Sequence, residues 1–354
     1  MDKRNFLRLL GRGAVMTTAA ATVPFSFMQA NAAQLPFISP VIYPPLLKVG
    51  DTIGIICPSG AIDEQLSFML IEETIQALGF KAKWGKHVHD RYGHLAGTDD
   101  ARLADLHMMF ADHDVKAIIC MRGGSGAARL LDRIDYNLIK RNPKIFLGYS
   151  DITALHLAIH SQTKLITFHG AVGISSWTTD LADQFKHLFL EGGSMVYTNP
   201  IDKGDQIVAT QNRIQTITSG TTEGRLIGGN LTVLTSIMGS NYFPDFTDSI
   251  LFLEEVGEEP YRIERMFCQL RLAGVLSKIK GFIFGQCVNC TPNAGYGSLS
   301  LDDVLADYIR PLHIPAYQGA MIGHIKNQFI LPIGLKIKMD ASAGTLVAVE
   351  EVFS

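Results

Sequence analysis

The sequence lacks a strong excess of charge of either sign: 31 Lys and Arg oppose 34 Asp and Glu, a formal net charge of −3. It therefore lacks the excess of basic residues that is typical of proteins that bind nucleic acid. Low-complexity segments and internal repeats are also missing. What remains is a 354-residue chain, 47% apolar, that is long enough for two domains with a core each.

Cysteine is scarce, with five residues in all. Cys57 and Cys120 end apolar strands, where a thiol usually fills the core. Cys287 and Cys290 form a C-x-x-C pair, which we expect to be two free thiols, a local disulfide being the less favoured alternative. No second such pair completes a zinc set, and the histidine-rich segment 87–94 is expected to be a solvated loop. No metal or cofactor is expected.

Residues 1–32 are expected to be an export signal and not part of the fold. Four basic residues precede an apolar or small-residue stretch, 13–28, and Ala30-Asn31-Ala32 fits a cleavage site. The stretch is short for a bilayer and contains Pro24, which disfavours a permanent anchor. Lys3-Arg4 resembles the twin-arginine signal with Lys in the first position, so we expect a periplasmic protein. Without this segment 27 basic residues oppose 33 acidic ones, a net charge of −6.

From residue 49 the pattern is strand, turn, helix, repeated. Continuous apolar strands at 52–57, 115–120 and 145–148 predict a parallel sheet covered by helices on both faces. The turns after them are expected to converge, because ligands bind beyond the carboxyl ends of such strands. Helices are predicted at 99–110, through Leu131, and after the first turn, where the last is expected to bury Leu66, Met69, Leu70, Ile75 and Leu78.

Three segments follow the predicted signal. Residues 45–198 form the parallel-sheet domain, and the polar, weakly periodic stretch 199–224 is expected to cross between domains. Residues 225–354 form a smaller mixed α/β domain, richer in short strands.

Ser150 is the best candidate nucleophile. The apolar strand 145–148 leads into Tyr149-Ser150-Asp151, and a helix-like run follows. This is the pattern of a nucleophile elbow, in which the first amides of the helix face the developing negative charge. An ordinary helix cap at Ser150 or Asp151 is an equally weighted alternative, since Ile152 replaces the usual final glycine.

A nucleophilic serine needs a base and an acid that orients it. His324 follows Gly323 at the end of an apolar segment, whereas His156 and His160 are expected on a helix that leads away from Ser150. Glu254 ends a buried strand, where an ionised carboxylate needs a partner. The alternative for Glu254 is a salt bridge to Arg262 or Arg265.

From about Leu47 to its end, the sequence resembles the L,D-carboxypeptidases, a serine peptidase family that includes the microcin C self-immunity peptidases. The motifs that carry the resemblance occur in one order along the chain. They are Lys48–Ile53, Pro58-Ser59-Gly60, Leu95–Asp99, Arg122-Gly123-Gly124, Gly148–Asp151, Gly228-Gly229-Asn230, Leu253-Glu254-Glu255, Pro260–Arg265 and Gly323-His324.

The resemblance implies a Ser150–Glu254–His324 triad, which selects the residues already preferred. It also implies a flavodoxin- or amidotransferase-like first domain, a homodimer, and release of the terminal D-alanine from murein tetrapeptides. For that reaction the backbone N–H groups of Asp151, Gly123 and Gly124 are the predicted oxyanion donors.

Arg122 and Asn230 are predicted to bind substrate, Arg122 because a guanidinium suits a terminal carboxylate. A structural ion pair is an equal alternative for Arg122. Two other functions remain open: hydrolysis of a peptidyl-nucleotide amide, and non-catalytic periplasmic binding.

Overall fold

The computed structural model describes residues 40–193, 196–201, 203–292 and 297–353. The predicted export signal, 1–32, lies outside these residues. Within the described ranges, no helix has both the length and the apolar character needed to cross a membrane.

The first sheet has six strands in the order β12-β5-β4-β3-β1-β2. Five of them are parallel, and β12 is antiparallel to β5. The parallel order 2-1-3-4-5 is that of flavodoxin-like sheets, as the resemblance implied. The strands are β1 (Thr52–Ile56), β2 (Lys81–Trp84), β3 (Val115–Cys120), β4 (Ile145–Gly148), β5 (Thr167–His169) and β12 (Leu331–Ile333).

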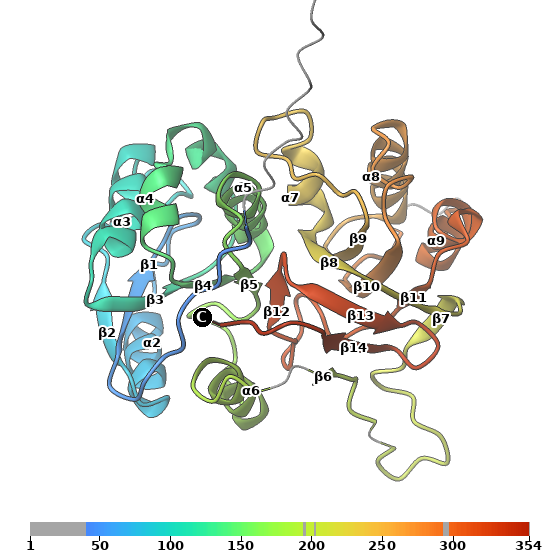
Figure 1. The fold of residues 1–354 in the computed structure, drawn as a ribbon, viewed down its shortest axis with the longest axis horizontal. Helices are drawn as coiled ribbons and strands as arrows, with labels where there is room; N and C mark the ends of the chain where they lie inside the picture. The colour runs from blue at the N-terminus through green and yellow to red at the C-terminus, as the bar shows by residue number, and fades with distance from the viewer. Residues whose placement is uncertain (1–39, 194–195, 202, 293–296, 354) are drawn as a thin grey trace, which may run out of the picture. The chain divides into compact units, whose positions relative to one another are not determined.

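Helices cover both faces of this sheet (Figure 1). Side chains of β3 show why: Ile118 and Cys120 pack in the core with α3 and α5, whereas Ala117 and Ile119 pack in the core with α2 and α6. The helices are α2 (Gln65–Ala77), α3 (Asp99–Ala111), α4 (Tyr136–Arg141), α5 (Thr153–Thr163) and α6 (Thr179–Phe189), with the 3₁₀ turns η1 (Ala127–Arg133) and η2 (Ser150–Ile152).

One local prediction in this half was wrong and another was right only in part. The segment through Leu131 is the 3₁₀ turn η1 and not an α-helix. Ile75 and Leu78 are buried as predicted, together with Phe68 and Ile71, whereas Leu66, Met69 and Leu70 are 59%, 52% and 51% exposed. Apolar residues occur on both sides of α2, and the side that carries Phe68 is the one that packs against the sheet. The ring of Phe68 also packs on Trp84.

The second sheet is mixed and, among the described residues, has eight strands in the order β6-β14-β13-β8-β9-β10-β11-β7. The four from β8 to β11 are parallel, and the others pair antiparallel. They are β6 (Val196–Tyr197), β7 (Gln215–Thr218), β8 (Thr221–Asn230), β9 (Ser249–Val256), β10 (Gly281–Val288), β11 (Ala316–Gln318), β13 (Lys336–Asp340) and β14 (Thr345–Ala348). The strand-rich, mixed α/β character expected from the sequence is confirmed.

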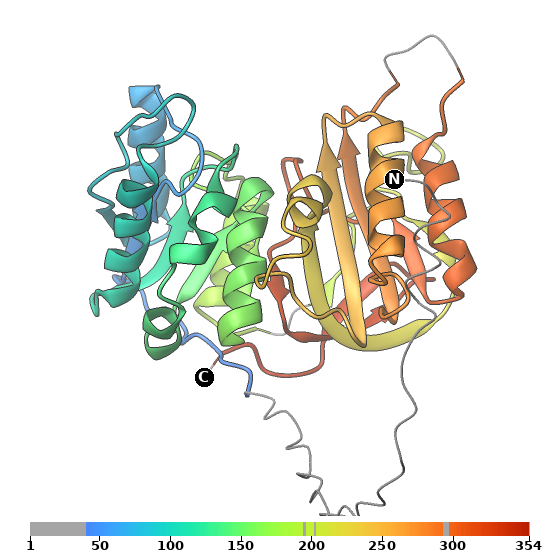
Figure 2. The same ribbon diagram turned by 90° about the horizontal axis from the view of Figure 1, so that it is seen from above.

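The described part of this half contains three α-helices and a 3₁₀ turn, and α8 and α9 (orange and orange-red in Figure 2) lie side by side along the sheet. Their bounds are α7 (Leu231–Ser236), α8 (Pro260–Leu272), α9 (Leu301–Tyr308) and η3 (Arg310–Leu312). Pro260 opens α8, a position where its missing N–H costs no helical hydrogen bond.

The chain does not divide cleanly at 198 and 225. Strand β6, within 45–198, pairs with β14 of the second sheet, and β12, within 225–354, pairs with β5 of the first. The stretch 199–224 contains β7 and the start of β8. Both hydrophobic clusters include side chains from both sheets, so the core is shared.

Candidate active site

Tyr149 separates Ser150 from the end of β4, and Ser150 begins the turn η2 that leads into α5. Its φ is +64°, in the left-handed region that side chains other than glycine seldom adopt. The preceding Tyr149 is fully extended, so the chain reverses at Ser150. The hydroxyl therefore lies at a strained strand-to-helix turn, beside helix-start amides that have no partners inside the helix. This agrees with the elbow expected from the sequence.

The structure brings Ser150, His324 and Glu254 together. The Nε2 atom of His324 lies 3.1 Å from Ser150 Oγ, and its Nδ1 atom lies 2.8 Å from Glu254 Oε2. The Glu254 side chain is fully buried, and that of His324 is 20% exposed. An ionised carboxylate can only accept, so Nδ1 carries the proton and Nε2 is left to accept from the serine hydroxyl.

Glu254 has no salt bridge to Arg262 or Arg265, the alternative raised from the sequence. The Arg262 guanidinium instead pairs with Glu258 across one turn, and that of Arg265 lies over the ring of Tyr261. Glu254 Oε1 has no hydrogen-bond partner among the described residues. Its charge is thus placed to stabilise an imidazolium at His324.

The histidine ring is held by its immediate neighbours. Gly323 has φ +110°, and a Cβ there would lie 2.7 Å from Glu254 Oε2, so only glycine lets the chain pass this close. The ring of Tyr149 packs against that of His324, with ring centroids 4.9 Å apart. This contact could not be predicted from the sequence, because Tyr149 and His324 lie far apart in the chain.

The turns after β1, β3 and β4 converge as expected. The Gly60 N–H donates to Gly123 O, which joins the first two turns. A Cβ added to Gly123 would lie 2.8 Å from Ser150 Cβ, 3.0 Å from its Oγ and 3.3 Å from the Asp151 nitrogen. The backbone at Gly123 therefore borders the space next to the hydroxyl.

Arg122 and Asn230 lie where the sheets end, but their side chains have protein partners. Arg122 donates from Nη1 to Ala61 O at 2.9 Å, and its buried Nε has no partner among the described residues. Asn230 caps α7 by accepting from the Val233 N–H and donates to Glu255 Oε1. Binding of substrate by either residue stays a prediction.

Glu255 is a second buried acid at this strand end, and no role was predicted for it from the sequence. Its carboxylate accepts from the N–H and hydroxyl of Thr232 and from the Asn230 amide. Burial raises the pKa of Glu255, and the neighbouring Glu254 adds to the rise. Two consecutive glutamates after an apolar strand were the available signal, since alternation predicts that one of them faces away from the core.

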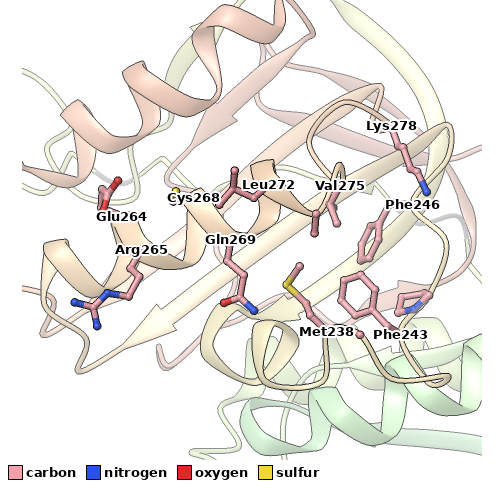
Figure 3. A pocket seen from close by; sticks show the side chains of 13 residues that line it. Met238, Phe243, Phe246, Glu264, Arg265, Cys268, Gln269, Leu272, Val275 and Lys278 are labelled. Carbon is pink, nitrogen blue, oxygen red and sulfur yellow. The ribbon is translucent and has the colours of Figure 1, made fainter. Parts of the chain in front are cut away.

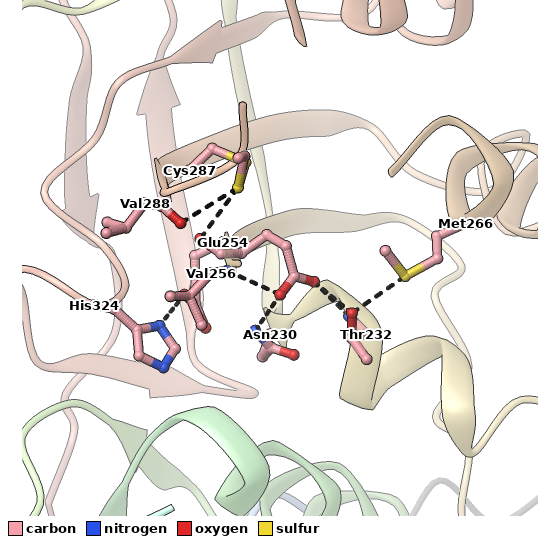
Figure 4. The surroundings of a disulfide bond; sticks show 10 residues. Asn230, Thr232, Glu254, Val256, Met266, Cys287, Val288 and His324 are labelled. Carbon is pink, nitrogen blue, oxygen red and sulfur yellow. Dashed lines mark hydrogen bonds and ion pairs between the residues drawn. A yellow bond between two sulfur atoms is a disulfide. The ribbon is translucent and has the colours of Figure 1, made fainter. Parts of the chain in front are cut away.

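Cys287 and Cys290 form a disulfide, which corrects the expectation of two free thiols. Asn289 has φ +57°, and this turn after β10 returns Cys290 toward Cys287, with 5.7 Å between their Cα atoms. Cys287 is paired with Glu255 across β10 and β9. The bridge thus lies beside the strand end that carries Glu254, as Figure 4 shows.

The histidine-rich segment 87–94 has other partners. His87 bonds to Asp90, the ring of His89 stacks on Phe68, and His94 bonds to Ser125 Oγ. Across the described ranges, no group of three His, Cys, Asp or Glu side chains is arranged to hold a metal ion.

A groove of about 800 Å³ lies between α8 and the segment that follows α7 (Figure 3). Its walls are largely apolar and contain none of Ser150, His324 and Glu254. They include Met238, Phe243, Phe246, Leu272 and Val275. The candidate catalytic residues therefore lie outside this groove, and they are identified by the distances between their side chains.

Known proteins resemble this chain in sequence and in fold. The probable murein peptide carboxypeptidase of Bacillus subtilis is 40% identical over 310 residues, covering 86% of this chain and 93% of that protein. The murein tetrapeptide carboxypeptidase of Pseudomonas aeruginosa is 31% identical over 293 residues, covering 80% and 91%. A solved structure of the microcin C7 self-immunity protein MccF, in its wild-type apo state, has a TM-score of 0.80 at 29% identity, covering 88% of this chain and 100% of that one.

The model for the LD-carboxypeptidase N-terminal domain matches residues 53–170, and that for the C-terminal domain matches residues 223–339. Ser150 lies in the first match, and Glu254 and His324 lie in the second. The sequence match, the two-sheet fold and the order of these three residues agree, and the chain is therefore a member of the LD-carboxypeptidase family of peptidases.

Proposed function

We propose that the protein is a serine L,D-carboxypeptidase that releases the terminal D-alanine from murein tetrapeptides. The observation that carries the proposal is the hydrogen-bonded chain from Ser150 Oγ through the His324 ring to Glu254. Such a chain activates a hydroxyl for attack on an amide. Relatives named murein peptide and murein tetrapeptide carboxypeptidase support the choice of substrate.

In the proposed reaction His324 Nε2 takes the proton of Ser150 as its oxygen attacks the amide carbonyl. Glu254 keeps the ring in the required tautomer and stabilises its charged form. The oxyanion is met by the N–H of Asp151 and by that of Gly123 or Gly124. The C–N bond then breaks, His324 gives its proton to the departing D-alanine nitrogen, and water hydrolyses the acyl-enzyme.

A carboxypeptidase must also bind the free carboxylate of its substrate. Arg122 is our candidate, because its guanidinium keeps unused donors next to the turns that surround Ser150. In the described part of the chain, no carboxylate is paired with it, and a backbone carbonyl holds one end in place. A guanidinium fork would bind a terminal carboxylate with two hydrogen bonds.

Export to the periplasm and a homodimer belong to the proposal as well. Export is supported by the sequence of residues 1–32 alone, and the homodimer by family resemblance. The alternative of a non-catalytic binding protein would give no reason for Ser150, His324 and Glu254 to lie within hydrogen-bond distance.

Mass spectrometry of a purified murein tetrapeptide, before and after incubation with the protein, tests the activity. We expect loss of one alanine, and much slower loss from the same peptide with its terminal carboxylate amidated. A peptidyl-nucleotide amide serves as the rival substrate, since MccF has the same fold. Faster cleavage of that amide, or no cleavage of any muropeptide, would refute the carboxypeptidase proposal.

Gly123→Ala is expected to lower kcat by about 10²–10³-fold, because its Cβ would push Ser150 Oγ and the neighbouring amide out of line. Steady-state kinetics on the tetrapeptide measures the loss. Gly297→Ala is the matched control, since a Cβ there meets nothing within 4 Å. Unchanged kcat in the Gly123 variant would show that the backbone at this turn does not border the reacting atoms.

A further inference from the structure

We infer that the carboxylate of Asp151 is a positioning residue, which aligns the oxyanion-binding amides by tying together the turns after β1, β3 and β4. The inference rests on the proposed function and assigns a role to a side chain that the mechanism leaves unused. In that mechanism only the backbone N–H of Asp151 takes part.

The Asp151 side chain is directed away from solvent and toward both neighbouring turns. The residue is 6% exposed, although an ionised carboxylate is normally solvated. Its Oδ2 atom accepts from Ser59 Oγ at 2.5 Å and from the Ala127 N–H at 2.8 Å. Ser59 is fully buried in the turn after β1, and Ala127 ends the glycine-rich turn after β3.

These two bonds fix the relative position of the proposed oxyanion donors. The Asp151 N–H belongs to the same residue as the carboxylate, and Gly123 and Gly124 lie in the turn that ends at Ala127. Bonds to a charged acceptor are short and roughly twice as strong as neutral ones, so they restrict the turns closely. An amide donor in a hydrolase must lie within a few tenths of an ångström of its position to stabilise the oxyanion.

A second buried charge ties the first two turns together independently. The Arg102 side chain has no exposed surface and donates from Nη1 to Pro58 O at 2.6 Å and to Gly126 O at 2.9 Å. Its Nη2 atom bonds to Asp99. Arg102 therefore joins the turns after β1 and β3, whereas the Asp151 carboxylate connects both of them to the turn that carries Ser150.

The test measures Asp151→Ala beside Asp151→Asn. Removing both bonds is expected to lower kcat by about 10²–10³-fold with KM changed less than about threefold, because the loss falls on oxyanion binding. Asparagine keeps an oxygen acceptor at the same place, so kcat is expected to stay within about tenfold of the parent. Ser59→Ala removes one bond and should fall between the two.

Ser249→Ala is the matched control. Ser249 is also fully buried and donates one hydrogen bond to a backbone carbonyl, that of Phe246, at the start of β9. A general loss of packing would lower the unfolding temperature of both serine variants, whereas a positioning role lowers kcat only for Ser59→Ala. If the Ser59 and Asp151 variants had the same kcat as the Ser249 variant, the inference would be overturned.

A fluorophosphonate probe separates the inference from the choice of substrate. Ser150 Oγ forms a bond to phosphorus, the P–F bond breaks, fluoride leaves and the hydroxyl proton passes to His324. Labelling of the parent without D-alanine release would refute the proposed substrate, while slow labelling of Asp151→Ala would still support the inference. Equal labelling rates for Asp151→Ala and the parent, or no labelling of the parent at Ser150, would overturn it.

Discussion

Replacing Ser150 with alanine is expected to lower kcat for D-alanine release by at least about 10⁴-fold, with tetrapeptide binding retained. The reason is that Oγ is the atom placed 3.1 Å from the His324 Nε2 atom, so its removal leaves the base without a nucleophile to activate. Single-turnover kinetics and a binding titration of the same variant measure the two quantities. Ser236→Ala, an exposed serine on α7, is the control.

A double variant tests whether Ser150 and His324 act in the same step. If Ser150 and His324 act as a unit, Ser150→Ala with His324→Ala should be about as slow as either single variant, because each change already abolishes the shared proton transfer. A double variant whose loss is the product of the two single losses would mean that they act separately. The triad proposal would then be abandoned.

Acidification is expected to destabilise the protein steeply between about pH 6.5 and pH 4. His156, His160 and His169 are buried in the first half of the chain, and burial lowers the pKa of His156 and His160 to about 4 and that of His169 well below 6.5. A histidine held neutral in the folded state stabilises it fully above the unfolded pKa. That stability is lost as the pH falls toward the folded pKa, because the unfolded chain binds the proton first.

The expected loss is about 3 kcal/mol for each of His156 and His160 over this range, a large part of the stability of an ordinary domain. Urea unfolding at a series of pH values measures it. His160→Gln should flatten the pH dependence by about that amount, whereas the exposed His113→Gln should not. A free energy of unfolding that stays constant from pH 6.5 to pH 4.5 would contradict the expectation.

The parallel sheet and the three convergent turns could be predicted from the sequence because each is a local pattern. An apolar run such as 115–120 is buried on both faces in a parallel sheet, and small residues follow where the chain must turn. Ser150, Glu254 and His324 were found because each follows an apolar segment at a strand end or loop. Their meeting was an expectation that needed coordinates, since 174 residues separate Ser150 from His324.

Features that depend on partners far away in the chain could not be predicted. The buried side of α2 was misassigned because periodicity does not distinguish two apolar sides. The sequence of β12, a strand of three residues, does not indicate that it pairs with β5 in the first sheet. The bonds of Asp151 likewise depend on Ser59, 92 residues earlier, whereas the Cys287–Cys290 pairing depends on the local backbone conformation at Asn289.

His324 lies in the segment between β11, in the second sheet, and β12, at the edge of the first. Its backbone is thus anchored at one end to each half of the molecule, while its ring touches Ser150 from one half and Glu254 from the other. A slide of one half past the other would pull the imidazole away from both neighbours at once. The rate of turnover would therefore depend on how closely the two halves pack together. A substitution far from Ser150 that weakens this packing would lower the rate without changing any of the reacting groups.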